Sequence, residues 1–254
     1  MNVDCGVITR LNVDLGRSGN VDRNSEDYLV PRLKQLRETW ARSFGEGSGD
    51  KVRWVHLMCD MDTPLSYLDE AESVLSKLPV DSQIILTEKQ WDARQEVLDY
   101  RDSYALFGGQ DLQDEQYTHL HLTVLDSDDV VSKKYFDHSA GVAASKWSHD
   151  ENAAFVLICE NGYVWDQVNR SLNKVHATSL KKGFVSSGCY SVCMPIESKL
   201  FPKERYLFGD GTCFCKMLTE HNGFSLGSDF SKTLEDSSNV VPISRLSGCF
   251  ASKP

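Results

Sequence analysis

Short apolar segments rich in β-branched residues alternate along this chain with segments whose apolar residues recur at helical spacing. This alternation is typical of βαβ units, which build a mostly parallel sheet flanked by helices. A chain of 254 residues buries enough surface in one such core to fold without a metal or a disulfide. We therefore predict a single α/β domain. Its strands are expected at 6–11, 52–58, 83–86, 120–125 and 153–158, and its helices at 29–44, 65–78, 91–106, 133–144 and 211–221.

Pro31 lies near the start of the first expected helix. The first turn tolerates proline, because its missing N–H has no helical partner there. Further along, apolar residues three or four positions apart should form one buried face of this helix. These residues are Leu29, Leu33, Leu36, Trp40 and Phe44.

The overall charge of the chain argues against nucleic acid as a partner. Its formal net charge is −10, so most of its surface would repel a phosphate backbone. No stretch approaches the roughly 18 apolar residues of a membrane span, and the first residues lack the basic start of a secretory leader. We expect a cytoplasmic protein with reduced, metal-free cysteines, because the 8 cysteines lack the usual zinc-knuckle spacing.

An acidic segment follows the strand expected at 120–125: Asp126, Ser127, Asp128 and Asp129 come directly after it. Open α/β sheets bind ligands at the carboxyl ends of their strands. Carboxylates one residue apart at such a position can face the same divalent cation, which in turn holds a nucleoside diphosphate. We predict that Asp126, Asp128 and Asp129 hold Mn²⁺ or Mg²⁺. The alternative is an acidic turn that caps the next helix.

Two arginines are candidates for binding the base, the ribose or the diphosphate of such a nucleotide. Arg10 ends the first strand, and Arg101 lies within the helix expected at 91–106. The planar fork of arginine suits phosphate oxygens. Arg101 has acidic neighbours on both sides, so a surface ion pair is the competing interpretation.

Three segments together resemble the rhamnosyltransferase-like family of GT-A glycosyltransferases, over roughly residues 7–131. They are Thr9-Arg10-Leu11-Asn12, the segment 60–64 that begins with Asp60, and Leu125-Asp126-Ser127-Asp128-Asp129. The resemblance implies a GT-A-like domain of the nucleotide-diphospho-sugar transferase type, with a nucleotide-sugar-binding half (1–131), an acceptor and catalytic half (132–227) and a polar tail (228–254). It also implies that Thr9, Asp60, Asp126 and Ser127 contact the donor.

Asp210 stands between two glycines at the start of the helix expected at 211–221. This position is similar to that of the acidic residue that serves as catalytic base in many inverting GT-A enzymes. A base there would take the proton of the acceptor hydroxyl as this attacks the anomeric carbon. The competing interpretation is an N-cap carboxylate stabilised by the helix dipole.

The predicted activity is transfer of a hexose or deoxyhexose from a nucleotide-diphosphate sugar to a hydroxyl of a saccharide or glycoconjugate, with inversion; rhamnose is the sugar that the resemblance implies. Four aromatic residues could stack on sugar rings of the acceptor, although core or rim packing is the more common role of Trp and Tyr: Trp147, Tyr163, Trp165 and Tyr190. Two alternatives are a sugar-nucleotide nucleotidyltransferase and a catalytically silent binding module. A third, a haloacid-dehalogenase-type phosphatase using Asp60 and Asp62, fits less well, because Pro64 stands where that family has Thr or Val.

Overall fold

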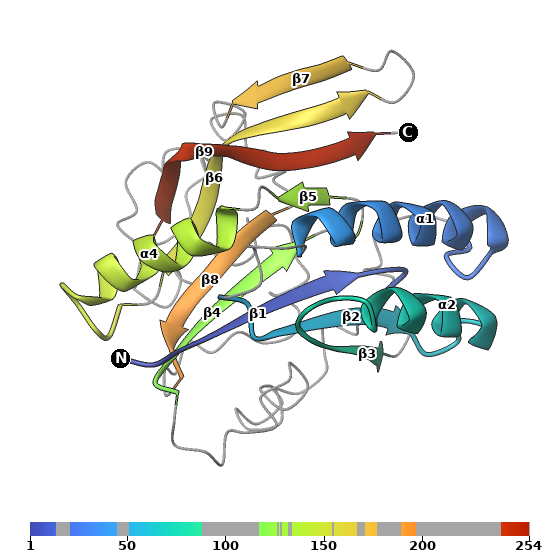
Figure 1. Cartoon of the computed structure of the whole chain (residues 1–254), viewed down its shortest axis with the longest axis horizontal. Coiled ribbons are helices and arrows are strands. Elements are labelled where there is room, and N and C mark those ends of the chain that lie inside the picture. The colour runs from blue at the N-terminus through green and yellow to red at the C-terminus, as the bar shows by residue number, and fades with distance from the viewer. Residues whose placement is uncertain are drawn as a thin grey trace, which may run out of the picture.

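A computed structural model gives the fold of the chain (Figure 1). The residues that the structure describes are 1–13, 21–44, 51–87, 117–125, 127, 129–131, 134–153, 155–166, 171–176, 189–196 and 240–253.

Four parallel strands form one half of the sheet, in the order β3-β2-β1-β4. They are β1 (Val3–Arg10), β2 (Trp54–Asp60), β3 (Asp81–Thr87) and β4 (His119–Leu125). Their positions match the strands expected from the sequence. Since β1 lies between β2 and β4, the carboxyl ends of these three strands meet at one edge of the sheet.

Antiparallel pairing extends the sheet beyond β4. There β8 (Cys189–Pro195) pairs with β4, and β6 (Phe155–Asp166) pairs with β8. The sheet then continues through β9 (Val240–Lys253), which runs parallel to β6, and β5 (Asp129–Val131), while β7 (Ser171–His176) pairs with β6. The predicted α/β class is confirmed, and the parallel strands β1 to β4 form one half of the sheet.

Strand β9 lies in the segment that the sequence analysis described as a polar tail, 228–254. The structure differs here, because Val240 and Val241 pair with Val156 and Leu157 of β6. The average composition of this segment is Ser-rich and polar, so its short apolar run was not recognised. That run is sufficient to form a strand beside β6.

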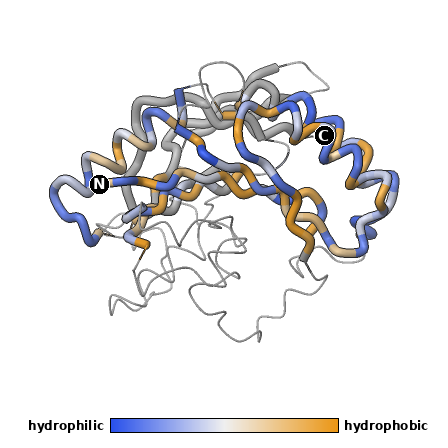
Figure 2. The backbone as a smooth tube through the Cα atoms, turned by 60° about the horizontal axis from the view of Figure 1, so that its bottom comes forward, coloured by the Kyte–Doolittle hydropathy of each residue, from blue (hydrophilic) through white to orange (hydrophobic). Residues whose placement is uncertain are grey.

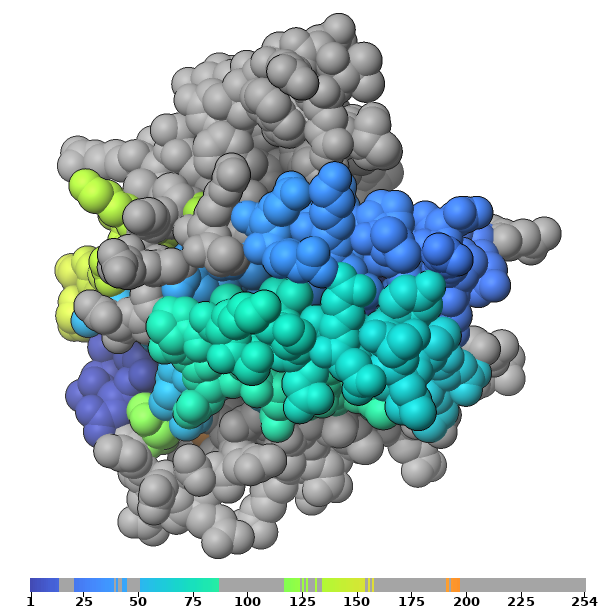
Figure 3. Space-filling model, turned by 45° about the vertical axis from the view of Figure 1, so that its right-hand side comes forward, coloured from blue at the N-terminus to red at the C-terminus, as the bar shows by residue number. Residues whose placement is uncertain are grey.

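Three helices are described: α1 (Glu26–Ser43), α2 (Leu65–Leu75) and α4 (Tyr135–Trp147). Figure 3 shows α1 and α2 side by side on one face of the molecule, where Arg37 and Glu70 form an ion pair between them. Among the described residues, no helix combines the length and apolar character that a membrane crossing needs.

Helix α1 begins one turn earlier than the sequence predicts. Pro31 therefore lies inside the helix and not in its first turn. Glu26 and Asp27 occupy the first turn instead, where their negative charges interact favourably with the helix dipole. The earlier start adds this favourable turn, which offsets part of the cost of the hydrogen bond that Pro31 cannot make.

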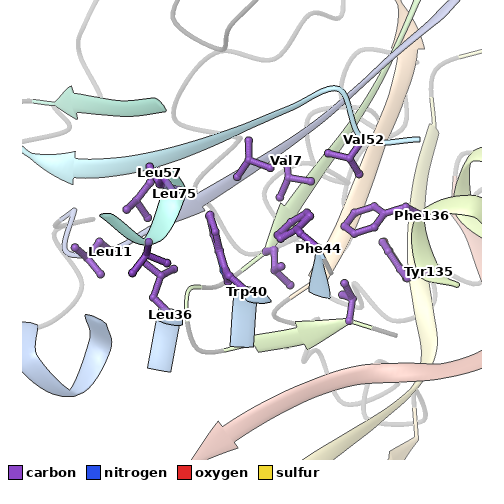
Figure 4. Close-up of a cluster of buried hydrophobic side chains, with 14 of the residues drawn as sticks. Val7, Leu11, Leu36, Trp40, Phe44, Val52, Leu57, Leu75, Tyr135 and Phe136 are labelled. Carbon is purple, nitrogen blue, oxygen red and sulfur yellow. The ribbon is translucent and has the colours of Figure 1, made fainter. Parts of the chain in front are cut away.

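The predicted apolar face of α1 is confirmed, and all five of its residues are fully buried. In Figure 2 the helices alternate between hydrophobic and hydrophilic residues along their length. Figure 4 shows Trp40 pointing from α1 toward the strands, and Phe44 stacks on Phe136 of α4 with ring centroids 5.4 Å apart. Each such side chain contributes about 1.5–3 kcal/mol through burial, so the α1 face anchors the helical layer on the sheet.

Candidate functional site

The parallel register brings the first three candidate segments to one edge of the sheet. Arg10 ends β1, Asp60 ends β2, and Ser127 lies two residues beyond β4. Arg10 pairs with Met58 of β2, and Ile8 pairs with Val124 of β4. Residues from three separate parts of the chain therefore meet where open α/β sheets bind ligands.

Asp60 is almost completely buried, with 3% of its surface exposed. Its Oδ1 accepts a hydrogen bond from the backbone N–H of Asp62 at 2.9 Å. Its backbone C=O accepts from the N–H of Thr63 at 2.9 Å and from the Thr63 hydroxyl at 2.5 Å. Among the described residues, the only hydrogen bond to this carboxylate is the one from Asp62.

Asn12 connects Asp60 to the rest of this edge. Its Oδ1 accepts the backbone N–H of Asp60 at 3.0 Å, and its Nδ2 donates to Asn24 Oδ1 at 2.6 Å and to Thr63 Oγ1 at 2.8 Å. Asn12 belongs to the quoted motif, but the sequence analysis assigned it no role. The available signal was an amide directly after a buried strand, a place where a polar side chain needs partners.

Two arginines missed by the sequence analysis reach the same edge from α1 and the segment before it. Arg32 donates to Ser127 Oγ at 3.4 Å, and its guanidinium lies 5.4 Å from the centroid of the Tyr28 ring. Arg23 donates to the carbonyl of Val13 at 2.8 Å and lies 5.8 Å from the same ring centroid. Tyr28 and Arg32 are four residues apart on one helical face, which was the signal in the sequence. A positive charge is thus brought to Ser127.

Thr9 lies on the face of the sheet that α1 covers, two residues after the core residue Val7. It is fully buried, and its hydroxyl has no hydrogen-bond partner among the described residues. Its role in donor binding stays a prediction.

Four of the remaining predicted site residues lie outside the described residues: Asp126, Asp128, Arg101 and Asp210. Asp129 is the first residue of β5, and its backbone pairs with Ala251 of β9. Within the described part of the chain, no group of three or more His, Cys, Asp or Glu side chains is placed to hold a metal ion. The Mn²⁺ or Mg²⁺ site therefore stays a prediction that depends on Asp126 and Asp128.

Trp147 does not line this edge. Its ring is buried between His119 and Phe155, with centroid separations of 4.5 and 5.5 Å, and its Nε1 donates to the carbonyl of Ala153 at 2.9 Å. Of the two interpretations of Trp147, core packing is therefore the one that the structure supports. Trp147 packs α4 onto the sheet instead.

Three of the cysteines in the described part of the chain are buried free thiols: Cys5, Cys59 and Cys193. Burial raises the pKa of the Cys5 and Cys59 thiols to about 12, and it raises the pKa of Cys193 well above its ordinary value. These thiols stay protonated near neutral pH, which makes them poor nucleophiles and poor metal ligands.

The fold and this edge together define a mixed α/β domain with a polar site at the carboxyl ends of parallel strands. No protein-family model matches the chain, and no curated protein does. The chain is similar to the crystal structure of a protein from Desulfovibrio desulfuricans G20 assigned as a nucleotide-diphospho-sugar transferase, with 11% identity and a TM-score of 0.42 over 100% of this chain and 83% of that one. It is also similar to mouse xyloside xylosyltransferase 1, with 9% identity and a TM-score of 0.34 over 92% of this chain and 80% of that one. Since both TM-scores are below 0.5, neither similarity decides the function.

Proposed function

We propose that the chain is a nucleotide-sugar glycosyltransferase of the GT-A type. The observation that carries this proposal is the parallel register of β2, β1 and β4. It brings the buried carboxylate of Asp60 to the same edge as Ser127, and in the sequence Ser127 stands between Asp126 and Asp128. A nucleotide-sugar donor requires one carboxylate to bind the nucleoside. It also requires a group of carboxylates to hold the cation that binds the diphosphate.

Asp60 binds the nucleoside in this proposal. Its second carboxylate oxygen accepts a hydrogen bond from an N–H of the base or a hydroxyl of the ribose, while the N–H of Asp62 holds the first. Burial strengthens such a hydrogen bond, because little water competes with the ligand. Arg10 and Arg101 neutralise the diphosphate, and Ser127 together with the fully buried Thr9 completes the donor contacts.

Asp126, Asp128 and Asp129 hold Mn²⁺ or Mg²⁺. The ion would supply positive charge to the departing diphosphate. The chain's own contribution is position: Ser127 is buried and accepts a hydrogen bond from Arg32, so α1 supports the backbone between Asp126 and Asp128.

Asp210 acts as general base on the acceptor hydroxyl. The hydroxyl oxygen forms a bond to the anomeric carbon as the bond from that carbon to the diphosphate breaks. The hydroxyl proton passes to Asp210, and the nucleoside diphosphate leaves with the bonding electrons. Attack from the opposite face inverts the anomeric centre. Rhamnose is the proposed sugar, and a saccharide is the proposed acceptor.

A thermal-shift screen tests the donor assignment. The purified chain is heated with Mn²⁺ and each of a set of nucleotide sugars, including uridine, thymidine and guanosine diphosphate sugars. A true donor at 100 times its Kd stabilises the fold by about 2.7 kcal/mol. Asp60→Asn should abolish the shift, whereas Arg37→Gln, at an ion pair between α1 and α2, should preserve it.

Product analysis then separates this activity from its alternatives. A glycosyltransferase releases the nucleoside diphosphate from the stabilising donor when an acceptor saccharide, or slowly water, takes the sugar. A nucleotidyltransferase instead requires a sugar phosphate and a nucleoside triphosphate. A binding module shows the thermal shift without any release. Absence of a shift with every donor would contradict the proposal.

A further inference from the structure

We infer that Asn12 is a positioning residue that sets the orientation of Asp60. Its side chain joins the end of β1, the turn 60–63 after β2 and the segment before α1, through Asp60, Thr63 and Asn24. The inference deepens the proposed function and rests on it in one respect, which is that Asp60 contacts the donor.

The hydrogen-bonding partners determine which way the Asn12 amide faces. The backbone N–H of Asp60 can only donate, so the atom 3.0 Å from it must be the oxygen Oδ1. The amide nitrogen then has two hydrogens, and it has two acceptors, Asn24 Oδ1 at 2.6 Å and Thr63 Oγ1 at 2.8 Å. Both hydrogens of this buried amide are used, so rotation of the side chain would break all three bonds.

Thr63 links Asn12 to Asp60 a second time. Its hydroxyl accepts from Asn12 and donates its own hydrogen to the carbonyl of Asp60. The N–H of Thr63 reaches the same carbonyl at 2.9 Å. The turn that carries Asp60 is therefore held at its N–H by Asn12, at its carbonyl by Thr63 and at its carboxylate by Asp62.

A side chain that only filled space would not show this pattern. Asn12 is 1% exposed, and at such burial an unpaired N–H or amide is costly. Loss of the Asn12 side chain leaves the N–H of Asp60 without an acceptor, and Asn24 without its donor. The turn 60–63 and the segment before α1 should then loosen together, although they are far apart in sequence.

Hydrogen exchange tests the positioning itself. The variants are Asn12→Ala and Thr63→Val, with Thr63→Ser as the conservative change that keeps the hydroxyl. Thr63→Val preserves the volume and removes only the two hydrogen bonds of the Thr63 hydroxyl, so it covers the case in which Asn12→Ala fails to fold. The control is Arg37→Gln, which removes an exposed ion pair between α1 and α2 and should leave exchange at 58–66 and 21–29 unchanged.

In Asn12→Ala, amide exchange across 58–66 and 21–29 should rise by about tenfold or more, because one lost hydrogen bond of ~1.4 kcal/mol corresponds to that factor. In Thr63→Val the increase in amide exchange should be confined to 58–66. Thr63→Ser should exchange at the same rate as the unaltered chain. Unchanged exchange at 58–66 in both Asn12→Ala and Thr63→Val would overturn the inference, whatever the chain binds.

Calorimetry with uridine, thymidine and guanosine diphosphates and Mn²⁺ tests the link to the site. If the unaltered chain binds one of them, Asn12→Ala should weaken that binding about tenfold or more, and Arg37→Gln should leave it unchanged. Equal binding by Asn12→Ala and the unaltered chain would overturn the inference. If the unaltered chain binds none of the three while exchange rises as expected, Asn12 still positions Asp60, and it is the proposed function that fails.

Discussion

The indole ring of Trp54 occupies the space into which any side chain at Gly6 would extend. A Cβ at Gly6 would lie 2.1 Å from Cζ2 and 2.3 Å from Cε2 of Trp54. The two residues are register partners in β1 and β2, and Trp54 is itself buried. The packing of the Trp54 ring of β2 against β1 therefore depends on glycine at position 6.

Gly6→Ala should destabilise the fold by about 1–3 kcal/mol or more, because the rigid ring and the strand must separate. The matched control is Gly141→Ala in α4, where an added Cβ meets nothing within 4 Å. That variant should gain about 0.5–1 kcal/mol, since alanine favours the helix over glycine. Urea denaturation of both variants measures the difference. Equal stability of the two would contradict this account of Gly6.

Asp4→Asn should destabilise the chain at the amino ends of β1 and β2. Arg53 donates to both oxygens of Asp4 at 2.7 and 2.9 Å, and Trp54 Nε1 donates to Oδ1 at 3.1 Å. Breaking a fully buried pair costs about 3–5 kcal/mol. We expect roughly 2–3 kcal/mol, because the Arg53 side chain is 27% exposed and water screens the pair. Chemical denaturation checks this, and a loss below about 0.5 kcal/mol would place the pair among ordinary surface contacts.

His121 should make the fold less stable in mild acid. Burial lowers its pKa to about 4 from the ordinary 6.5, and its Nε2 has no hydrogen-bond partner among the described residues. The unfolded chain therefore binds the proton first as the pH falls. Stability is unaffected by this group above pH 6.5 and declines between 6.5 and about 4, by roughly 3 kcal/mol in total.

His121→Phe should remove this part of the pH dependence, because it replaces the imidazole with an apolar ring. Denaturation at several pH values between 7 and 4 measures the difference from the unaltered chain. Gly141→Ala, which removes no titratable group, serves as control and should leave the pH dependence unchanged. Parallel curves for His121→Phe and the unaltered chain would mean that His121 is not the titrating group.

Asp128→Asn should abolish metal-dependent donor binding and leave the fold intact. Its predicted role is to supply one of the carboxylate oxygens that hold Mn²⁺ or Mg²⁺. Calorimetry with the metal and with the nucleotide measures both affinities, and circular dichroism checks the fold. Unchanged affinity for metal and nucleotide would place the site elsewhere.

Asp210→Asn should reduce turnover by about 10² to 10⁴ while donor affinity stays nearly constant. The amide keeps the shape and much of the capping ability of the carboxylate, but it cannot take a proton. Measurement of kcat for transfer beside Kd for the donor separates a base from a helix cap. A fall of less than about tenfold, or ~1.4 kcal/mol in the barrier, would exclude Asp210 as the base.

The sequence alone determined the elements whose signal is local. The buried face of α1 follows from spacing along one helix, and the parallel strands follow from apolar runs separated by helical segments. The place of Asp60 and Ser127 at the ends of strands could also be predicted, because parallel strands point their carboxyl ends to one edge. Periodicity is a property of consecutive residues, so it can be read without the fold.

The tertiary structure alone decided the contacts between distant segments. Asn12 meets Asn24 and Thr63 only because β1, β2 and the start of α1 come together. Val240 and Val241 enter the sheet only because β6 offers an edge that a Ser-rich composition does not reveal. Trp147 could be assigned to the core only once His119 and Phe155 were placed against it. Such pairings depend on the free energy of packing over the whole chain, which no local pattern encodes.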